Sequence, residues 1–351
     1  GHFVIFILHS YMNKKTKGEI MNNFKKIGFS ALAGSLVALT SASAVEMAVS
    51  GSARVTYANT DQTEVTGNPL GMNTSMGFTG AGDVNGYETT LFVTSADSVG
   101  GMSSASLSVN LGDMGVVSFD QGVGIGGIST IDDKTPSAYE EVWDGLDAVV
   151  GDANGLVGGG NAGVIVYSNT FMDTGVSLQY GKGASATNAD NGTSGASSGS
   201  SWDVALTNST MMDGMDVGFG YGKIANNAPG ANGSDIDEHM VAFVNYTVGP
   251  VTAGYTQAQI STGVQGGASE HATGWGVAVN LMDNLSASYG EREVEQENAS
   301  AAHVTEDMEG YAVSYTMGSA TIAFQNNETG NNGGTNGTND ENTEIALSLS
   351  F

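Results

Sequence analysis

From residue 45 onward, the chain is a succession of short segments in which apolar and polar residues alternate. In the first of them, residues 46–58, Val49 and Val55 fall on one face, and Ser50 and Arg54 fall on the other. A period of two residues is that of a β-strand with one apolar face. No long amphipathic helical pattern follows the first fifty positions, so the sequence predicts an all-β chain.

The alternation predicts sixteen strands, most of them near ten residues long. Tight turns rich in Gly, Asp, Asn or Pro alternate with long polar connections such as 183–201 and 327–344, which indicates an up-and-down antiparallel sheet. His239, His271 and His303 recur along this pattern and are interpreted as structural or surface residues. The predicted strands are 46–58, 72–80, 86–97, 104–111, 115–121, 162–171, 175–182, 201–210, 215–224, 238–247, 251–260, 272–281, 285–294, 308–317, 320–329 and 343–351.

In a sheet of sixteen strands, the edge strands need partners and the apolar face needs an apolar environment. A flat sheet would leave two edges exposed, and a soluble barrel of this size would be too wide for side chains to fill. In a membrane, the apolar faces meet lipid and the polar faces meet water, and a tilted ten-residue strand spans roughly 23 Å. The sequence therefore predicts a 16-stranded antiparallel transmembrane β-barrel. Its many inward Gly, Ser, Thr and Ala residues are interpreted as suiting water rather than packing.

The N-terminal part differs from the rest of the chain. Residues 21–44 have a basic start, an apolar run and a small-residue end, which is typical of a secretory signal peptide, and 1–20 is interpreted as an upstream extension. The remainder, 45–351, is predicted to be one barrel domain. Removing 1–44 leaves 5 of the 10 basic and 36 of the 37 acidic residues, a formal charge of −31. Such a chain is not expected to bind nucleic acid, and without cysteine it can form no disulfide.

The longest connection between predicted strands, residues 123–161, is the main candidate site. Apolar residues such as Ile125, Ile131 and Trp143 stand among its acids, so we expect the segment to fold inside the barrel and narrow a pore. Its acids would then form the negative side of a constriction and favour cations; the alternative is a solvated acidic surface loop. The acids are Asp132, Asp133, Glu140, Glu141, Asp144, Asp147 and Asp152.

Basic residues are scarce, so their positions are informative. Arg54 and Arg292 have the parity of the polar, inward face and are predicted to form a positive pore wall, whereas Lys182 and Lys223 have outward parity near strand ends. The glycine motif over 122–127 matches a dinucleotide fingerprint, but no helix follows it, so it is discounted.

Four features together resemble the trimeric general porins of Gram-negative bacteria, of the alphaproteobacterial type. They are the signal peptide, the sixteen strands, the long acidic segment and a last strand, TEIALSLSF, that ends on Phe351. The resemblance implies an outer-membrane homotrimer in contact with lipid and lipopolysaccharide. It also implies that the assembly machinery reads Phe351, and that 123–161 is the third external loop, folded into the lumen. The shortage of basic residues departs from the family's pattern.

The sequence therefore predicts a passive diffusion channel for small hydrophilic solutes and ions, with a preference for cations and no catalysis. A substrate-specific porin with a binding track and an outer-membrane structural protein or adhesin are the alternatives. An enzyme would need a Ser or Asp/His constellation within the strands, which the sparse histidines do not offer. No cofactor is expected beyond weak Ca²⁺ binding by acidic external loops such as 327–344.

Overall fold

The computed structural model describes residues 46–60, 67–96, 102–132, 134–146, 162–182, 200–226, 235–263, 268–298 and 304–351. The predicted extension 1–20 and the predicted signal peptide 21–44 lie outside these residues. Among the described residues, no helix is long and apolar enough to cross a membrane.

Sixteen strands make up almost all of the regular structure. They are β1 (Glu46–Thr60), β2 (Leu70–Val84), β3 (Tyr87–Ala96), β4 (Ser104–Asn110), β5 (Val116–Gln121), β6 (Ala162–Phe171), β7 (Thr174–Gly181), β8 (Ser201–Asn208), β9 (Met215–Asn226), β10 (Asp235–Val248), β11 (Val251–Ser261), β12 (Ala268–Met282), β13 (Leu285–Asn298), β14 (Val304–Met317), β15 (Ala320–Gly330) and β16 (Asn339–Ser350). The described residues also form three short 3₁₀ turns, η1 (Gly112–Met114), η2 (Ile128–Thr130) and η3 (Asn332–Gly334).

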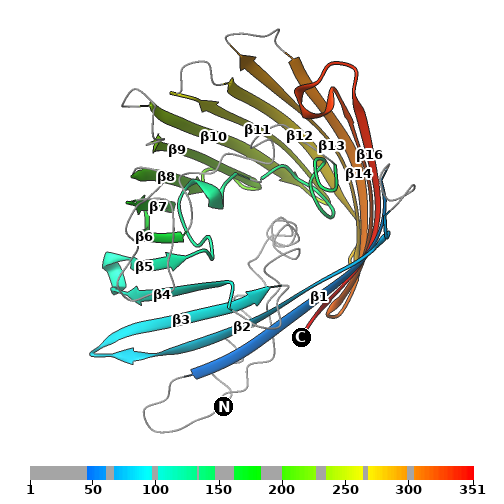
Figure 1. Cartoon of the computed structure of the whole chain (residues 1–351). Helices are drawn as coiled ribbons and strands as arrows, with labels where there is room; N and C mark the ends of the chain where they lie inside the picture. The colour runs from blue at the N-terminus through cyan, green and yellow to red at the C-terminus, as the bar shows by residue number, and fades with distance from the viewer. Residues whose placement is uncertain are drawn as a thin grey trace.

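The strands form one closed antiparallel barrel (Figure 1). Each strand pairs with its neighbours in sequence, and β1 pairs with β16 to close the ring. At the closure, the backbone N–H of Gly51 donates to the carbonyl of Phe351 at 2.7 Å, and the N–H of Phe351 donates to the carbonyl of Gly51 at 2.9 Å. The predicted 16-stranded antiparallel barrel is confirmed.

All sixteen strands lie on predicted ranges, and the largest differences are at strand ends. β14 begins at Val304 rather than at 308, and β16 begins at Asn339 rather than at 343. The connection predicted as a long loop over 327–344 is therefore mostly strand. The carboxylate of Glu306 explains part of this, since it accepts hydrogen bonds from the hydroxyl of Thr329 and from the N–H of Gly333, both at 3.2 Å, and so fixes the turn between β15 and β16.

The two faces of the sheet differ as the alternation predicts. On β10, Val244 and Tyr246 are exposed, whereas Val241, Phe243 and Asn245 between and beside them are buried. In a closed barrel the exposed apolar set faces outward, because the buried set contacts the chain segment that follows β5. That segment is the feature around which the inner wall is arranged.

Candidate functional site: the segment after β5

Asp120, near the end of β5, directs the start of the segment. Its carboxylate is fully buried and accepts hydrogen bonds from the backbone N–H groups of Val123, Gly124 and Ile125 at 2.8, 2.8 and 2.9 Å. Gly124 has a φ of +77°, which suits glycine. The glycine motif discounted as a nucleotide fingerprint is therefore the turn by which the chain leaves the sheet.

An apolar contact holds the next part of the segment. Ile128 and Ile131 are 0% and 1% exposed and pack in one cluster with inner-facing residues such as Val241 and Phe243. The backbone N–H of Ile128 also donates to the Oδ1 of Asp203 on β8 at 2.8 Å. This part of the segment is thus attached to the wall formed by β8–β10.

Inward-facing glycines make room for the segment along the following strands. A Cβ on Gly220 of β9 would lie 2.6 Å from Ile128, and one on Gly254 of β11 would lie 2.5 Å from the Pro136 ring. On β12, a Cβ on Gly276 would lie 2.6 Å from the carbonyl oxygen of Pro136. Real Cβ atoms do not approach other atoms this closely, so these three positions require the smallest residue. The interpretation that inward glycines merely suit water is wrong for them, because they are packed against the segment.

Hydrogen bonds from strand side chains continue the attachment. The amide of Asn245 on β10 donates to the carbonyl of Lys134 at 2.8 Å. Further along, the N–H of Ala138 donates to the hydroxyl of Ser288 on β13 at 2.8 Å. In Figure 1 the described residues of the segment, 123–132 and 134–146, are drawn on the inner side of the ring of strands, in agreement with these contacts.

Four polar side chains meet where the segment reaches β16 and β1. Arg54 of β1 forms an ion pair with Glu140 and donates from Nη1 to the hydroxyl of Tyr139 at 3.3 Å. The Tyr139 hydroxyl in turn donates to Oε1 of Glu344 on β16 at 3.0 Å. Burial, and secondly the charge of Glu344, raise the pKa of the Tyr139 hydroxyl above its ordinary value, so it remains a hydrogen-bond donor.

The last described part of the segment folds as a turn against β13 and β15. The guanidinium carbon of Arg292 lies 4.3 Å from the centre of the Trp143 ring, a cation–π distance, and Arg292 is only 5% exposed. The amide of Asn327 donates to the carbonyls of Glu141 and Asp144 at 3.0 and 2.9 Å. Asp144 also accepts from the N–H of Glu141 at 2.8 Å, which closes the turn.

The structure places the predicted site residues in three groups: arginines that contact the segment, acids that are partly buried, and acids outside the described residues. Both predicted wall arginines contact the segment itself, Arg54 through Glu140 and Arg292 through Trp143. The acids Asp132, Glu140, Glu141 and Asp144 are partly buried. The predicted acids Asp133, Asp147 and Asp152 lie outside the described residues.

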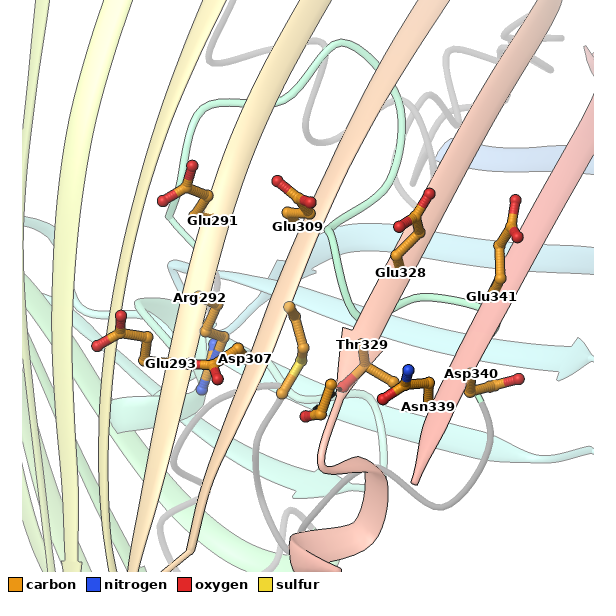
Figure 2. A pocket seen from close by; sticks show the side chains of 12 residues that line it. Glu291, Arg292, Glu293, Asp307, Glu309, Glu328, Thr329, Asn339, Asp340 and Glu341 are labelled. Carbon is orange, nitrogen blue, oxygen red and sulfur yellow. Dashed lines mark hydrogen bonds between the residues drawn. The ribbon is translucent and has the colours of Figure 1, made fainter. Parts of the chain in front are cut away.

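A second acidic feature lies on the outward face and was not predicted. Glu291, Glu309, Glu328 and Glu341 stand directly opposite one another in register across β13, β14, β15 and β16. They line a hollow of about 700 Å³ (Figure 2). Tyr289 bounds the row and donates to Glu291 at 2.8 Å and to Glu309 at 2.5 Å. We call these four residues the glutamate row. Among the described residues, no group of three or more His, Asp or Glu is arranged to hold a metal ion.

Several solved structures share this architecture. The OmpT outer membrane protein of Vibrio cholerae, folded in vitro, gives a TM-score of 0.64 at 14% identity, with 90% of this chain and 100% of that chain covered. OmpF of Salmonella typhi in complex with daunomycin gives a TM-score of 0.62 at 13% identity, with 88% of this chain and 98% of that chain covered. The anion-selective porin from Comamonas acidovorans gives a TM-score of 0.62 at 12% identity, with 87% of this chain and 99% of that chain covered. No protein-family model and no curated protein matches the sequence.

These likenesses define the fold as that of outer-membrane porins and channels. At 12–14% identity they establish the fold alone. One of the three is described as anion-selective, so any ion preference of this chain has to follow from its own charges.

Proposed function

We propose that the chain is a passive diffusion channel of the outer membrane, through which small hydrophilic solutes and ions pass without catalysis or a cofactor. A barrel of sixteen strands leaves an aqueous lumen, and the segment after β5 would narrow it. The observation that carries the proposal is the attachment of residues 123–132 and 134–146 to inner-facing side chains from β8 round to β1. Attachment at so many points keeps a constriction at a fixed size.

The channel would prefer cations. Without residues 1–44, the chain has 36 acidic and 5 basic residues. Of the two arginines predicted to form a positive wall, Arg54 is opposed by Glu140 and Arg292 is covered by Trp143. Charged groups at a constriction set ion selectivity, and the remaining acids of the segment would make this one negative.

The outward face of the barrel indicates which molecules surround it. Its exposed apolar side chains suit lipid, and we propose contacts with outer-membrane lipid and lipopolysaccharide. One similar structure is described as a trimer form of OmpT from Vibrio cholerae, which supports a homotrimer. Phe351 is 64% exposed at the barrel closure, where the assembly machinery could read it. Weak Ca²⁺ binding by the acidic external loops remains a prediction.

The test is the single-channel conductance and the reversal potential in a salt gradient, measured in planar bilayers. The variant replaces the four described acids of the segment, Asp132, Glu140, Glu141 and Asp144, by their amides. A matched control neutralises four outward acids, Glu293, Asp307, Glu328 and Glu341. We expect stepwise ohmic current, and a cation preference that falls in the variant but not in the control.

Two results would contradict the proposal in different ways. Absence of current from a correctly folded barrel would exclude the channel. Current whose selectivity is the same in the wild type and in the segment variant would exclude the segment as the selectivity filter.

A further inference from the structure

Two amide side chains of the inner wall are buried without hydrogen bonds. Gln325 of β15 and Asn342 of β16 are each 1% exposed. Both polar atoms of each amide lack a hydrogen-bond partner among the described residues. Burying polar groups without hydrogen bonds is costly, and native structures rarely tolerate it. Two such amides close together indicate that another group satisfies their oxygen atoms.

The strand register places both amides beside a carboxylate. Glu344 stands directly opposite Gln325 across β15 and β16. Asn342 lies two residues before Glu344 on the same strand and therefore on the same face. Directly opposite and diagonal neighbours in an antiparallel pair are about 5–8 Å apart. The amide oxygens of Gln325 and Asn342 and the carboxylate of Glu344 can therefore converge on one point.

The segment after β5 covers this cluster. The Tyr139 hydroxyl donates to Glu344 at 3.0 Å, and a Cβ on Gly145 would lie 2.0 Å from the Asn342 amide nitrogen. The ligand is thus enclosed between the inner wall and the segment, and it must be small.

The charges select the kind of ligand. Arg54, Glu140 and Glu344 are linked through Tyr139, and their formal charges sum to −1. Two amide oxygens and one carboxylate are hard oxygen ligands, of the kind that bind alkali and alkaline-earth cations. A Ca²⁺ site normally has several carboxylates, whereas one positive charge would balance this cluster. We propose that Gln325, Asn342 and Glu344 bind a monovalent cation, Na⁺ or K⁺, beneath the segment.

The test uses the purified, folded barrel in detergent. Thermal unfolding is followed by circular dichroism in choline, sodium and potassium chloride at equal ionic strength. We expect the wild type to unfold about 2 °C higher with a bound alkali ion than in choline, because a ligand that binds only the folded state stabilises it and the shift per unit of free energy is small for a long chain. The difference between sodium and potassium would identify the preferred ion.

Variants locate the effect. In Gln325→Leu and Asn342→Leu the dependence on the alkali ion should disappear, and in choline these variants should be at least as stable as the wild type, because the unsatisfied amides are gone. Gln259→Leu is the matched control, since Gln259 is exposed on the outward face. The control should keep the dependence.

Several outcomes would overturn the site. A wild type equally stable in all three salts would mean that the amides are satisfied by water alone, and dependence that survives in both leucine variants would place the ion elsewhere. If the variants do not fold, wild-type crystals soaked in rubidium or thallium salt test whether an ion binds at this site. An anomalous peak beside Gln325 and Asn342 is expected, and its absence would exclude the site. None of these readouts requires conduction, so they stand apart from the channel proposal.

Discussion

Tyr139 and Glu344, 205 positions apart in sequence, are joined by a hydrogen bond of 3.0 Å from the tyrosine hydroxyl to the carboxylate. This bond ties the tip of the segment after β5 to the last strand of the barrel. Arg54 on the first strand reaches the same hydroxyl. The segment is therefore attached to both strands that close the ring.

Replacing Tyr139 by phenylalanine should loosen that attachment. The ring is kept, but Glu344 loses a donor and Arg54 loses an acceptor. A hydrogen bond of this kind contributes about 1 kcal/mol, so the unfolding temperature in detergent should fall slightly and the single-channel current should become noisier. Tyr57→Phe, at an exposed outward position, is the control. Equal noise in the two variants would contradict this role.

The same tyrosine predicts a dependence of stability on pH. Burial and Glu344 raise the pKa of Tyr139 above its ordinary value of 10.0. Above pH 10 the unfolded chain would lose this proton while the folded chain keeps it, so the free energy of unfolding should decrease. Below pH 10 both states are protonated and Tyr139 contributes no pH dependence. Denaturant titrations from pH 8 to 11 should show a smaller decrease in Tyr139→Phe than in the wild type.

Gly254→Ala tests whether the inward glycines hold the segment in place. The new methyl group would meet both the Asn245 side chain and the Pro136 ring, and overpacking of this kind costs about 1–3 kcal/mol. The segment is the part that can move, so we expect an increased or unsteady conductance from an intact barrel. The control is Gly330→Ala, where nothing lies within 4 Å of the new atom. Unchanged conductance in Gly254→Ala would show that the strands yield instead.

Arg54→Gln should raise the preference for cations. Glu140 would lose its opposing charge, and one unit charge at about 5–8 Å in a watery pore changes an ion's energy enough to alter the permeability ratio about two- to fourfold. Glu140→Gln should shift the reversal potential in the opposite direction. Shifts of the same sign in the two variants would mean that displacement of the segment, rather than charge, controls selectivity.

Glu328→Gln should stabilise the barrel at low salt. Glu328 stands between Glu309 and Glu341 in the glutamate row, and like charges directly opposite one another are destabilising by a few tenths of a kcal/mol. The gain in unfolding temperature should vanish in concentrated salt, which screens the repulsion. Asp113→Asn, at an exposed position outside the row, should show no such dependence on salt.

The strands were predictable because their signal is local. The alternation of apolar and polar residues identifies each strand by itself. Closure into a barrel is then expected, because an open sheet of sixteen strands would leave two edge strands unpaired. The strand ends were predicted less accurately. β14 starts four residues before its predicted first residue, because the position of a strand end depends on how far the neighbouring strand extends to pair with it.

The contacts of the site were not predictable from local patterns. Arg54 and Glu140 were both selected as site residues, but on opposite sides of the pore. They form one ion pair because the segment packs against β1 and β16, where Tyr139 contacts both Arg54 and Glu344. Tyr139 carried no signal beyond being apolar among acids. The packing role of the inward glycines was not predicted. Which atoms lie against a glycine depends on the assembled strands, and the residue itself gives no sequence signal for them. Asp120 alone had a usable signal, an acid directly before a glycine-rich turn.

The contacts of the segment also set an order of events in folding. The partners from Asp203 on β8 to Glu344 on β16 lie later in the chain, with sequence separations from 75 to 205 residues, whereas Arg54 on β1 precedes the segment. Contacts this distant form slowly, because a long loop has to be closed first. The segment can therefore dock only after the C-terminal half of the barrel has formed. Until then Ile128 and Ile131 have no apolar partners, so each newly made chain passes through a stage in which this segment needs protection from aggregation.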